Sequence, residues 1–237
     1  MNNLNKLKIQ LPEWVTKLFP DAIWRLPTGE KVVYLTFDDG PIPEVTPLVL
    51  DLLKERDIKA TFFCVGENVS KYPELFKRIK AEGHSVGNHT YNHLQGMKYS
   101  TSDYLQNIEK ANSLIRSNMF RPPHGWLTRL QYWSIIGKYK LVMWDVISCD
   151  YDSSLSPEKC FRNVADFVRD GSIITFHDSL KAKKNVLAAL PKTIDYLTKE
   201  GYSFRKIEFP KIYPMKNTVP QKIQNMRNSI RQLLKGA

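Results

Sequence analysis

One strand-like segment of this chain ends on two adjacent carboxylates, and this junction constrains the fold more than any other feature. Residues 32–37 are apolar or β-branched, and they are followed directly by Asp38, Asp39, Gly40 and Pro41. A buried strand does not end on two charged groups unless these have partners. Because Gly40 and Pro41 turn the chain, both carboxylates are expected at the carboxyl end of the strand, where α/β folds bind ligands. The alternative is a simple turn in which both aspartates cap the next helix.

Three further strand-like segments, over residues 85–88, 140–144 and 172–176, also run into acidic or imidazole side chains. The residues that follow them are His89, His93, Asp145, Asp150, His177 and Asp178. The carboxyl ends of parallel strands share one edge of a sheet, so a single site on a common rim explains these junctions together. For Asp145 and Asp178, the alternative is that they only cap or turn the chain.

Short apolar strands alternate with amphipathic helices along the chain. Besides the strands above, strands are expected at 60–65 and 119–121, and helices over 45–56, 72–81, 102–116, 128–136, 156–168 and 184–199. Ser102 and Ser156 are the expected N-caps of two of these helices. Such alternation is typical of a parallel sheet with helices outside it. It predicts an α/β fold, a distorted (β/α) barrel of about seven parallel strands with outer helices.

The length of 237 residues suits one α/β barrel-like domain, and two small domains are the alternative. We expect an N-terminal extension over 1–30 that packs on the barrel, a catalytic domain over 31–215 and a basic amphipathic helix over 216–237. In this last segment apolar residues recur at helical spacing among lysines and arginines. Such a helix can pack on the barrel, pair with another subunit or lie on an anionic membrane. No pattern specifies the oligomeric state.

The formal net charge of +11 raises the question of a nucleic-acid partner. We expect none, because the lysines are dispersed and no basic run alternates with aromatic residues. Three cysteines without CxxC spacing are expected to be free buried thiols. The N-terminus lacks an apolar signal-peptide core, and no segment reaches the roughly 20 apolar residues of a membrane helix. If Met1 is the natural start, we expect a cytoplasmic protein, with peripheral membrane contact only through the C-terminal helix.

His89 and His93 are spaced to chelate one divalent ion, since imidazoles four residues apart share a face if their segment is helical. A catalytic zinc takes three protein ligands and leaves one position open for water. Asp38 or Asp39 can supply the third ligand, and the other carboxylate can then act as a general base toward that water. The alternative is a surface turn without metal.

Three motifs, in this order, resemble the polysaccharide deacetylase family, which is carbohydrate esterase family four. They read TFDDG at 36–40, HTYNH at 89–93 and RPPHG at 121–125. The resemblance extends from about Lys31 to Phe204. It implies a distorted (β/α) barrel and an N-deacetylase activity on chitin, chitooligosaccharides or peptidoglycan.

The resemblance also implies a role for each motif residue. Asp39, His89 and His93 correspond to the ligands of one divalent ion, for which zinc is expected and cobalt or another divalent ion is an alternative. Asp38 corresponds to the general base, and Arg121 to the group that tethers it. A guanidinium and a dication both favour the ionised carboxylate, so this base is expected to be deprotonated.

Two further residues correspond to the acid side of the reaction. His177 corresponds to the general acid that protonates the departing amine, and Asp150 to the aspartate that holds this histidine and keeps it charged. The family's fourth motif, Asp-x-x-Asp-Trp, reads ISCDY at 147–151 here, without the first acid. Thr175 stands where the family carries a leucine that lines the pocket for the acetyl methyl group. A polar residue there is expected to admit a different acyl group.

Substrate contacts are expected from the loops beside the motifs. Pro122 and Pro123 stiffen their loop, so that the backbone N–H of His124 can face a developing oxyanion while its side chain lies at the rim. The aromatic residues expected to stack on a sugar ring are Tyr91, Trp126 and Tyr151.

Together these patterns predict a metal-dependent hydrolase that removes an N-acetyl group from an amino sugar of a polysaccharide, oligosaccharide or glycolipid. One alternative is a deformylase or amidohydrolase on a lipid-linked sugar or a non-sugar amide, which the lack of a secretion signal favours. Another is a catalytically idle carbohydrate-binding module. The presence of all ligands, the base and the acid argues against that module.

Overall fold

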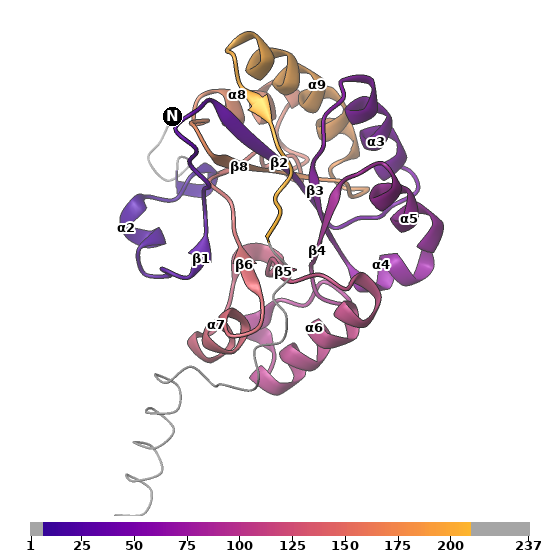
Figure 1. The fold of residues 1–237 in the computed structure, drawn as a ribbon, viewed down its shortest axis with the longest axis vertical. Coiled ribbons are helices and arrows are strands. Elements are labelled where there is room, and N and C mark those ends of the chain that lie inside the picture. Colours follow the sequence, from indigo (N-terminus) through magenta and orange to yellow (C-terminus); the bar gives the residue numbers. More distant parts are fainter. Residues whose placement is uncertain (1–6, 210–237) are drawn as a thin grey trace, which may run out of the picture.

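Nine short parallel strands form the centre of the structure, a computed structural model that describes residues 7–209. They are β1 (Ala22–Ile23), β2 (Val32–Asp38), β3 (Thr61–Cys64), β4 (Ser85–Asn88), β5 (Met119–Phe120), β6 (Lys140–Val142), β7 (Val146–Ile147), β8 (Ser172–His177) and β9 (Ser203–Phe204). The strand order is β1-β6-β5-β4-β3-β2-β8-β7, and β9 also pairs with β2. The sheet curls around its own axis (Figure 1). The expected distorted barrel is confirmed, with nine strands among the described residues where about seven were expected.

The helices surround this sheet and connect successive strands (Figure 1). They are α2 (Glu13–Thr16), α3 (Thr46–Glu55), α4 (Gly66–Lys71), α5 (Pro73–Ala81), α6 (Thr101–Ile115), α7 (Arg129–Ile136), α8 (Pro157–Ala165) and α9 (Lys183–Lys199), with 3-10 turns η1 (Gly96–Lys98) and η2 (Pro123–Gly125). Each long helix buries one face; in α3 the fully buried side chains include Val49, Leu50 and Leu53. Burying each of them stabilises the fold by about 2 kcal/mol.

Polar side chains cap the first turns of three of the described helices, α6, α7 and α8. Ser156 accepts the backbone N–H of Lys159 and caps α8, as its position in the sequence predicted. The predicted cap of α6 was wrong: Ser100, and not Ser102, accepts the backbone N–H of Asp103. The α6 helix therefore begins at the residue after Ser100, because a serine two positions earlier already satisfies an N–H of the first turn.

Strand β2 carries the first two site residues into the middle of the barrel. Leu35 and Phe37 pack in the core cluster that contains the buried residues of α3 and α9, so the alternating residues Tyr34, Thr36 and Asp38 face the opposite side, the barrel interior. The whole strand is buried. Pairing with β8 places Asp38 directly beside His177. Strand register thus brings together two residues that are 139 positions apart in the chain.

The described residues before β2 contribute one strand to the sheet. This strand, β1, pairs with β6, and the Gln10 amide donates to the Asp145 carboxylate and to the Phe167 carbonyl. The predicted C-terminal helix over 216–237 lies outside the described residues. All three cysteines are buried free thiols, as expected. Within residues 7–209, none of the helices has both the length and the apolar character needed to cross a bilayer.

Candidate functional site

Asp39, His89 and His93 converge at the carboxyl ends of β2 and β4. One ligand atom from each lies within 4.8 Å of the other two. His93 Nε2 lies 3.1 Å and His89 Nε2 3.7 Å from Asp39 Oδ1. This oxygen is buried, yet it accepts no hydrogen bond. A buried carboxylate oxygen without a donor, facing two imidazole nitrogens, is the arrangement that a divalent cation would satisfy, and these are ligand types that zinc takes.

The protonation of these groups suits metal binding. His89 Nδ1 lies 2.8 Å from the Arg121 carbonyl oxygen and donates to it, which leaves the Nε2 lone pair directed at Asp39. Burial lowers the pKa of His89 to about 4, so the ring is neutral near pH 7. Burial alone would raise the pKa of Asp39, but the close His93 ring and the charges of the neighbouring histidines hold it well below its usual range.

The segment that carries the two histidines is a loop, so the helical explanation of their spacing was wrong. Strand β4 ends at Asn88, and Thr90 and His93 have φ values of 64° and 58°. The Asn88 side chain accepts the N–H of Thr90, and the Thr90 hydroxyl accepts the N–H of Leu94. The two rings converge because these left-handed residues fold the loop back over the strand end.

Asp39 itself has a left-handed backbone, with φ of 84°. For a residue other than glycine this costs of the order of 1–3 kcal/mol, and such conformations concentrate at functional sites. Neighbouring side chains hold it: Asn68 donates to the Asp39 carbonyl, and the buried Asp178 accepts the N–H of Gly40 and the hydroxyl of Thr46. Asp178 thus supports the turn and does not contact the ligand cluster. The sequence indicated Asp178 as a candidate by its position at a strand end, whereas nothing in the sequence indicated that Asn68 supports this turn.

Asp38 is held by a buried arginine. Arg121 Nη1 lies 2.7 Å from Asp38 Oδ1, and the arginine side chain has no exposed surface. The rest of the guanidinium donates to the carbonyls of Val142 and Met143 and lies 4.0 Å over the ring of Phe63. Burial lowers the pKa of Arg121, and the charge of Asp38 opposes that effect. A guanidinium stays protonated in proteins, so Arg121 presents a buried positive charge to Asp38.

His177 is held by a buried aspartate in the same manner. Its Nδ1 lies 2.7 Å from Asp150 Oδ1, and its backbone N–H donates to Asp150 Oδ2 at 2.8 Å. Burial by itself would lower the pKa of His177, but the Asp150 carboxylate, with Asp39 and Asp38, raises it to about 9. The ring is therefore protonated near pH 7. Its Nε2 points away from Asp150 and is free to donate a proton.

Two of the predicted substrate-binding residues, His124 and Tyr151, lie beside this cluster. The His124 ring is 4.8 Å from the His93 ring, and the Tyr151 ring is 5.0 Å from the His177 ring. Trp126 follows the η2 turn and is 56% exposed. The His124 ring therefore lies next to His93, and the Tyr151 ring next to His177.

The other two predicted substrate-binding residues, Tyr91 and Thr175, make contacts within the protein. Tyr91 packs against α4 and α6, with Lys110 Nζ 3.6 Å from its ring centre. Thr175 has no exposed surface, and its hydroxyl lies 3.2 Å from both Thr36 Oγ1 and Arg121 Nη1. Thr175 therefore lies beneath Asp38, inside the barrel, and its role in an acyl pocket stays a prediction.

Asp145 does not lie at the carboxyl ends of the strands, where the candidate site is. Its carboxylate binds the Arg169 guanidinium and the hydroxyl of Ser172. Ser172 begins β8 and His177 ends it, so Asp145 lies at the opposite end of that strand from the site. Its role is structural.

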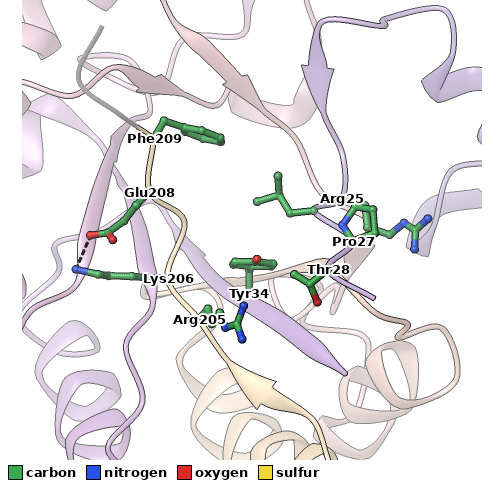
Figure 2. A pocket seen from close by; sticks show the side chains of 9 residues that line it. Arg25, Pro27, Thr28, Tyr34, Arg205, Lys206, Glu208 and Phe209 are labelled. Atoms are coloured by element: carbon green, nitrogen blue, oxygen red, sulfur yellow. Dashed lines mark ion pairs between the residues drawn. The ribbon is translucent and has the colours of Figure 1, made fainter. Parts of the chain in front are cut away.

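A separate hollow of about 400 Å³ lies on the side of Tyr34, four residues before Asp38 on β2 (Figure 2). Its cationic side chains already have partners: Arg25 donates to the Asp170 carbonyl, Arg205 pairs with Glu30, and Lys206 pairs with Glu208. None of the predicted site residues lines it. It offers no reactive group, so the rim of β2, β4 and β8 is the candidate site.

Known proteins are similar to this chain in sequence and in fold. A family model described as polysaccharide deacetylase matches residues 25–136. The chain is 34% identical over 188 residues to a peptidoglycan-N-acetylglucosamine deacetylase of Bacillus cereus, covering 76% of this chain and 88% of that protein. It is 29% identical over 204 residues to a chitooligosaccharide deacetylase of Azorhizobium caulinodans, covering 77% and 96%.

Solved structures agree with these matches. The Bc1960 peptidoglycan N-acetylglucosamine deacetylase, in complex with a naphthalenyl N-hydroxybenzamide, has a TM-score of 0.76 at 33% identity, covering 82% of this chain and 94% of that one. BA3943 of Bacillus anthracis, a CE4 family pseudoenzyme, has a TM-score of 0.68 at 27% identity, covering 78% and 67%. The fold alone therefore does not decide activity. The sequence matches confirm the predicted membership: this chain belongs to the polysaccharide deacetylase family and is a hydrolase of the deacetylase class.

Proposed function

We propose that this protein is a metal-dependent N-deacetylase that removes the acetyl group from N-acetylglucosamine residues of a glycan. The main support is the convergence of three groups at one rim: the Asp39–His89–His93 cluster, a carboxylate held by arginine, and an imidazolium held by aspartate. Relatives named peptidoglycan-N-acetylglucosamine deacetylases favour a cell-wall glycan as the substrate.

In this proposal Asp39, His89 and His93 hold one divalent ion, for which zinc is the best candidate. When bound, such an ion supplies Lewis acidity toward the acyl carbonyl oxygen and makes water more acidic. The chain prepares for it by directing His89 Nε2 inward through the hydrogen bond to the Arg121 carbonyl.

The chain's own residues then move two protons. Asp38, held in place by Arg121, takes a proton from the water that attacks the acyl carbon. When the C–N bond breaks, His177 donates its Nε2 proton to the leaving nitrogen, and Asp150 stabilises the imidazolium until that moment. A positioned base or acid contributes typically 10²- to 10⁴-fold in rate. In this proposal the backbone N–H of His124 faces the developing oxyanion and stabilises it.

Acetate release tests this proposal directly. Protein stripped with a chelator and reloaded with zinc or cobalt is incubated with chitooligosaccharides and with peptidoglycan fragments, and the stripped protein is the matched control. We expect acetate only from the reloaded protein, and inhibition by an N-hydroxybenzamide such as the one bound in the Bc1960 structure. Equal release with and without metal would contradict the metal dependence, and no release from any acetylated sugar would contradict the N-deacetylase assignment.

The deformylase alternative is separated by comparing N-formyl with N-acetyl glucosamine oligosaccharides. Faster release of formate by more than tenfold would favour it.

Membrane contact through residues 216–237 stays a prediction. It is tested by binding of the full chain, and of a variant that ends at Asn217, to anionic liposomes.

A further inference from the structure

A second layer of polar side chains lies beneath the proposed base and acid, inside the barrel. Strands β2 and β8 pair Asp38 with His177 and, two residues earlier, Thr36 with Thr175. Neither threonine has exposed surface. Leaving a buried hydroxyl without a hydrogen bond costs about 1–3 kcal/mol of stability. The role of this layer can therefore be inferred from the hydrogen bonds of the two threonine hydroxyls.

Counting protons fixes the direction of these hydrogen bonds. Thr36 Oγ1 donates its only proton to the Ile174 carbonyl at 2.9 Å. Toward Thr175 Oγ1, 3.2 Å away, it can therefore only accept, so Thr175 is the donor of that bond. The remaining lone pairs of both hydroxyls face Arg121 Nη1, at 2.8 Å from Thr36 and 3.2 Å from Thr175.

The same nitrogen, Nη1, also holds the base. It has two protons, and Asp38 Oδ1 lies 2.7 Å from it. One proton therefore serves Asp38, and the other is shared by Thr36 and Thr175. The Val142 carbonyl accepts the Nε proton, and the Met143 carbonyl accepts one of the two Nη2 protons. Every guanidinium nitrogen thus has a partner, and the threonine pair accepts the second proton of Nη1, the nitrogen that also binds Asp38.

We propose that Thr175 is a positioning residue for the base Asp38, acting through Thr36 and Arg121, and that it has no part in an acyl pocket. This inference rests on the proposed function for its kinetic consequence. Arg121 keeps Asp38 aimed only if the guanidinium does not rotate, and a group misplaced by about 1 Å can cost on the order of 10²-fold in rate. Thr175 has no exposed surface, so substrate affinity should not depend on it.

The kinetic test uses three variants of the zinc-loaded full chain. Thr175→Val keeps the side-chain shape but removes the hydroxyl, Thr175→Ser keeps the hydroxyl, and Thr36→Val removes its acceptor. We expect about a tenfold fall in kcat with KM within twofold for both valine variants, and recovery in the serine variant to within threefold of the wild type. Zinc content should be equal in all of them. A change in KM or in the acetyl-to-formyl ratio, with kcat unchanged, would show an acyl-pocket role and overturn the proposal.

A second readout does not depend on activity. In ¹⁵N NMR spectra of the arginine side chains, the Nη protons of Arg121 should be resolved and exchange slowly in the wild type and in Thr175→Ser, but rapidly in Thr175→Val. Thr175→Ala gives the same comparison if the valine variant does not fold. Unchanged Arg121 signals on loss of the hydroxyl would overturn the positioning role. The expected NMR changes in a protein that releases no acetate would instead refute the proposed function alone.

Discussion

Replacing Asp150 by asparagine removes one buried charge with little change of shape. We expect this change to alter the pKa of His177. Asp150 has no exposed surface, and its two oxygens bind the Nδ1 and the backbone N–H of His177 at 2.7 and 2.8 Å. An asparagine can still accept the backbone N–H, but its amide would donate to Nδ1 and so favour the neutral ring. The pKa of His177 should therefore fall from about 9 toward or below 6.5.

The effect of Asp150→Asn on the stability of the protein follows from the same pKa values of His177. A pKa raised from 6.5 to about 9 corresponds to about 3 kcal/mol, at 1.36 kcal/mol per pKa unit. Because the folded pKa is the higher one, this contribution is fully present below pH 6.5 and is lost as the pH rises through 9. Asp150→Asn should therefore lower the free energy of unfolding by up to about 3 kcal/mol at pH 6, and by much less above pH 9.

The effect on turnover has the same origin. At pH 7.5 nearly all His177 is protonated in the wild type, whereas a ring with a pKa of 6.5 is protonated to about one tenth. We expect kcat to fall at least tenfold at that pH and the alkaline limb of the pH profile to move down by about two pH units. Asp152→Asn is the matched control, because that carboxylate is exposed and binds Ser154.

Two measurements check this prediction on metal-free protein, since a bound cation would add its own charge near His177. NMR titration of ¹³C-labelled histidine gives the pKa of His177 in both proteins, and urea unfolding at pH 6 and pH 9.5 gives the stabilities. The reasoning would be refuted by a His177 pKa within half a unit of the wild type, or by the same loss of stability at both pH values.

The remaining predictions concern the ligands, the base and the turn. His93→Ala should abolish stoichiometric zinc binding, measured by elemental analysis, while the melting temperature of the metal-free protein stays within a few degrees, because the ring is at the rim. Asp38→Asn should retain zinc and lose 10²- to 10⁴-fold in kcat; near-normal turnover would assign the base elsewhere. Gly40→Ala would drive a Cβ into the Asp178 carboxylate, so we expect a loss of about 1–3 kcal/mol in thermal or urea unfolding, and an unchanged stability would contradict the described turn.

The pattern of residues along the chain was sufficient for the fold class and for most members of the site. Carboxylates and imidazoles stand at the ends of apolar segments, and parallel strands bring their carboxyl ends to one edge whatever the details of packing. For this reason the strand pattern alone could group Asp38, Asp39, His89, His93 and His177. Local chemistry also predicted the cap of α8, where Ser156 precedes a proline.

Which of the remaining candidates face the site depends on long-range packing. Strand alternation places Thr175 on the same face as His177, but it does not tell how deep a side chain lies; Arg121, 54 residues away in the chain, fills the space above it. Asp145 and Tyr91 were likewise assigned to other partners, Arg169 and Lys110, by packing between distant segments. Periodicity reports which way a side chain points, whereas contacts between residues far apart in the chain decide what it meets there, and those contacts exist only once the barrel has formed.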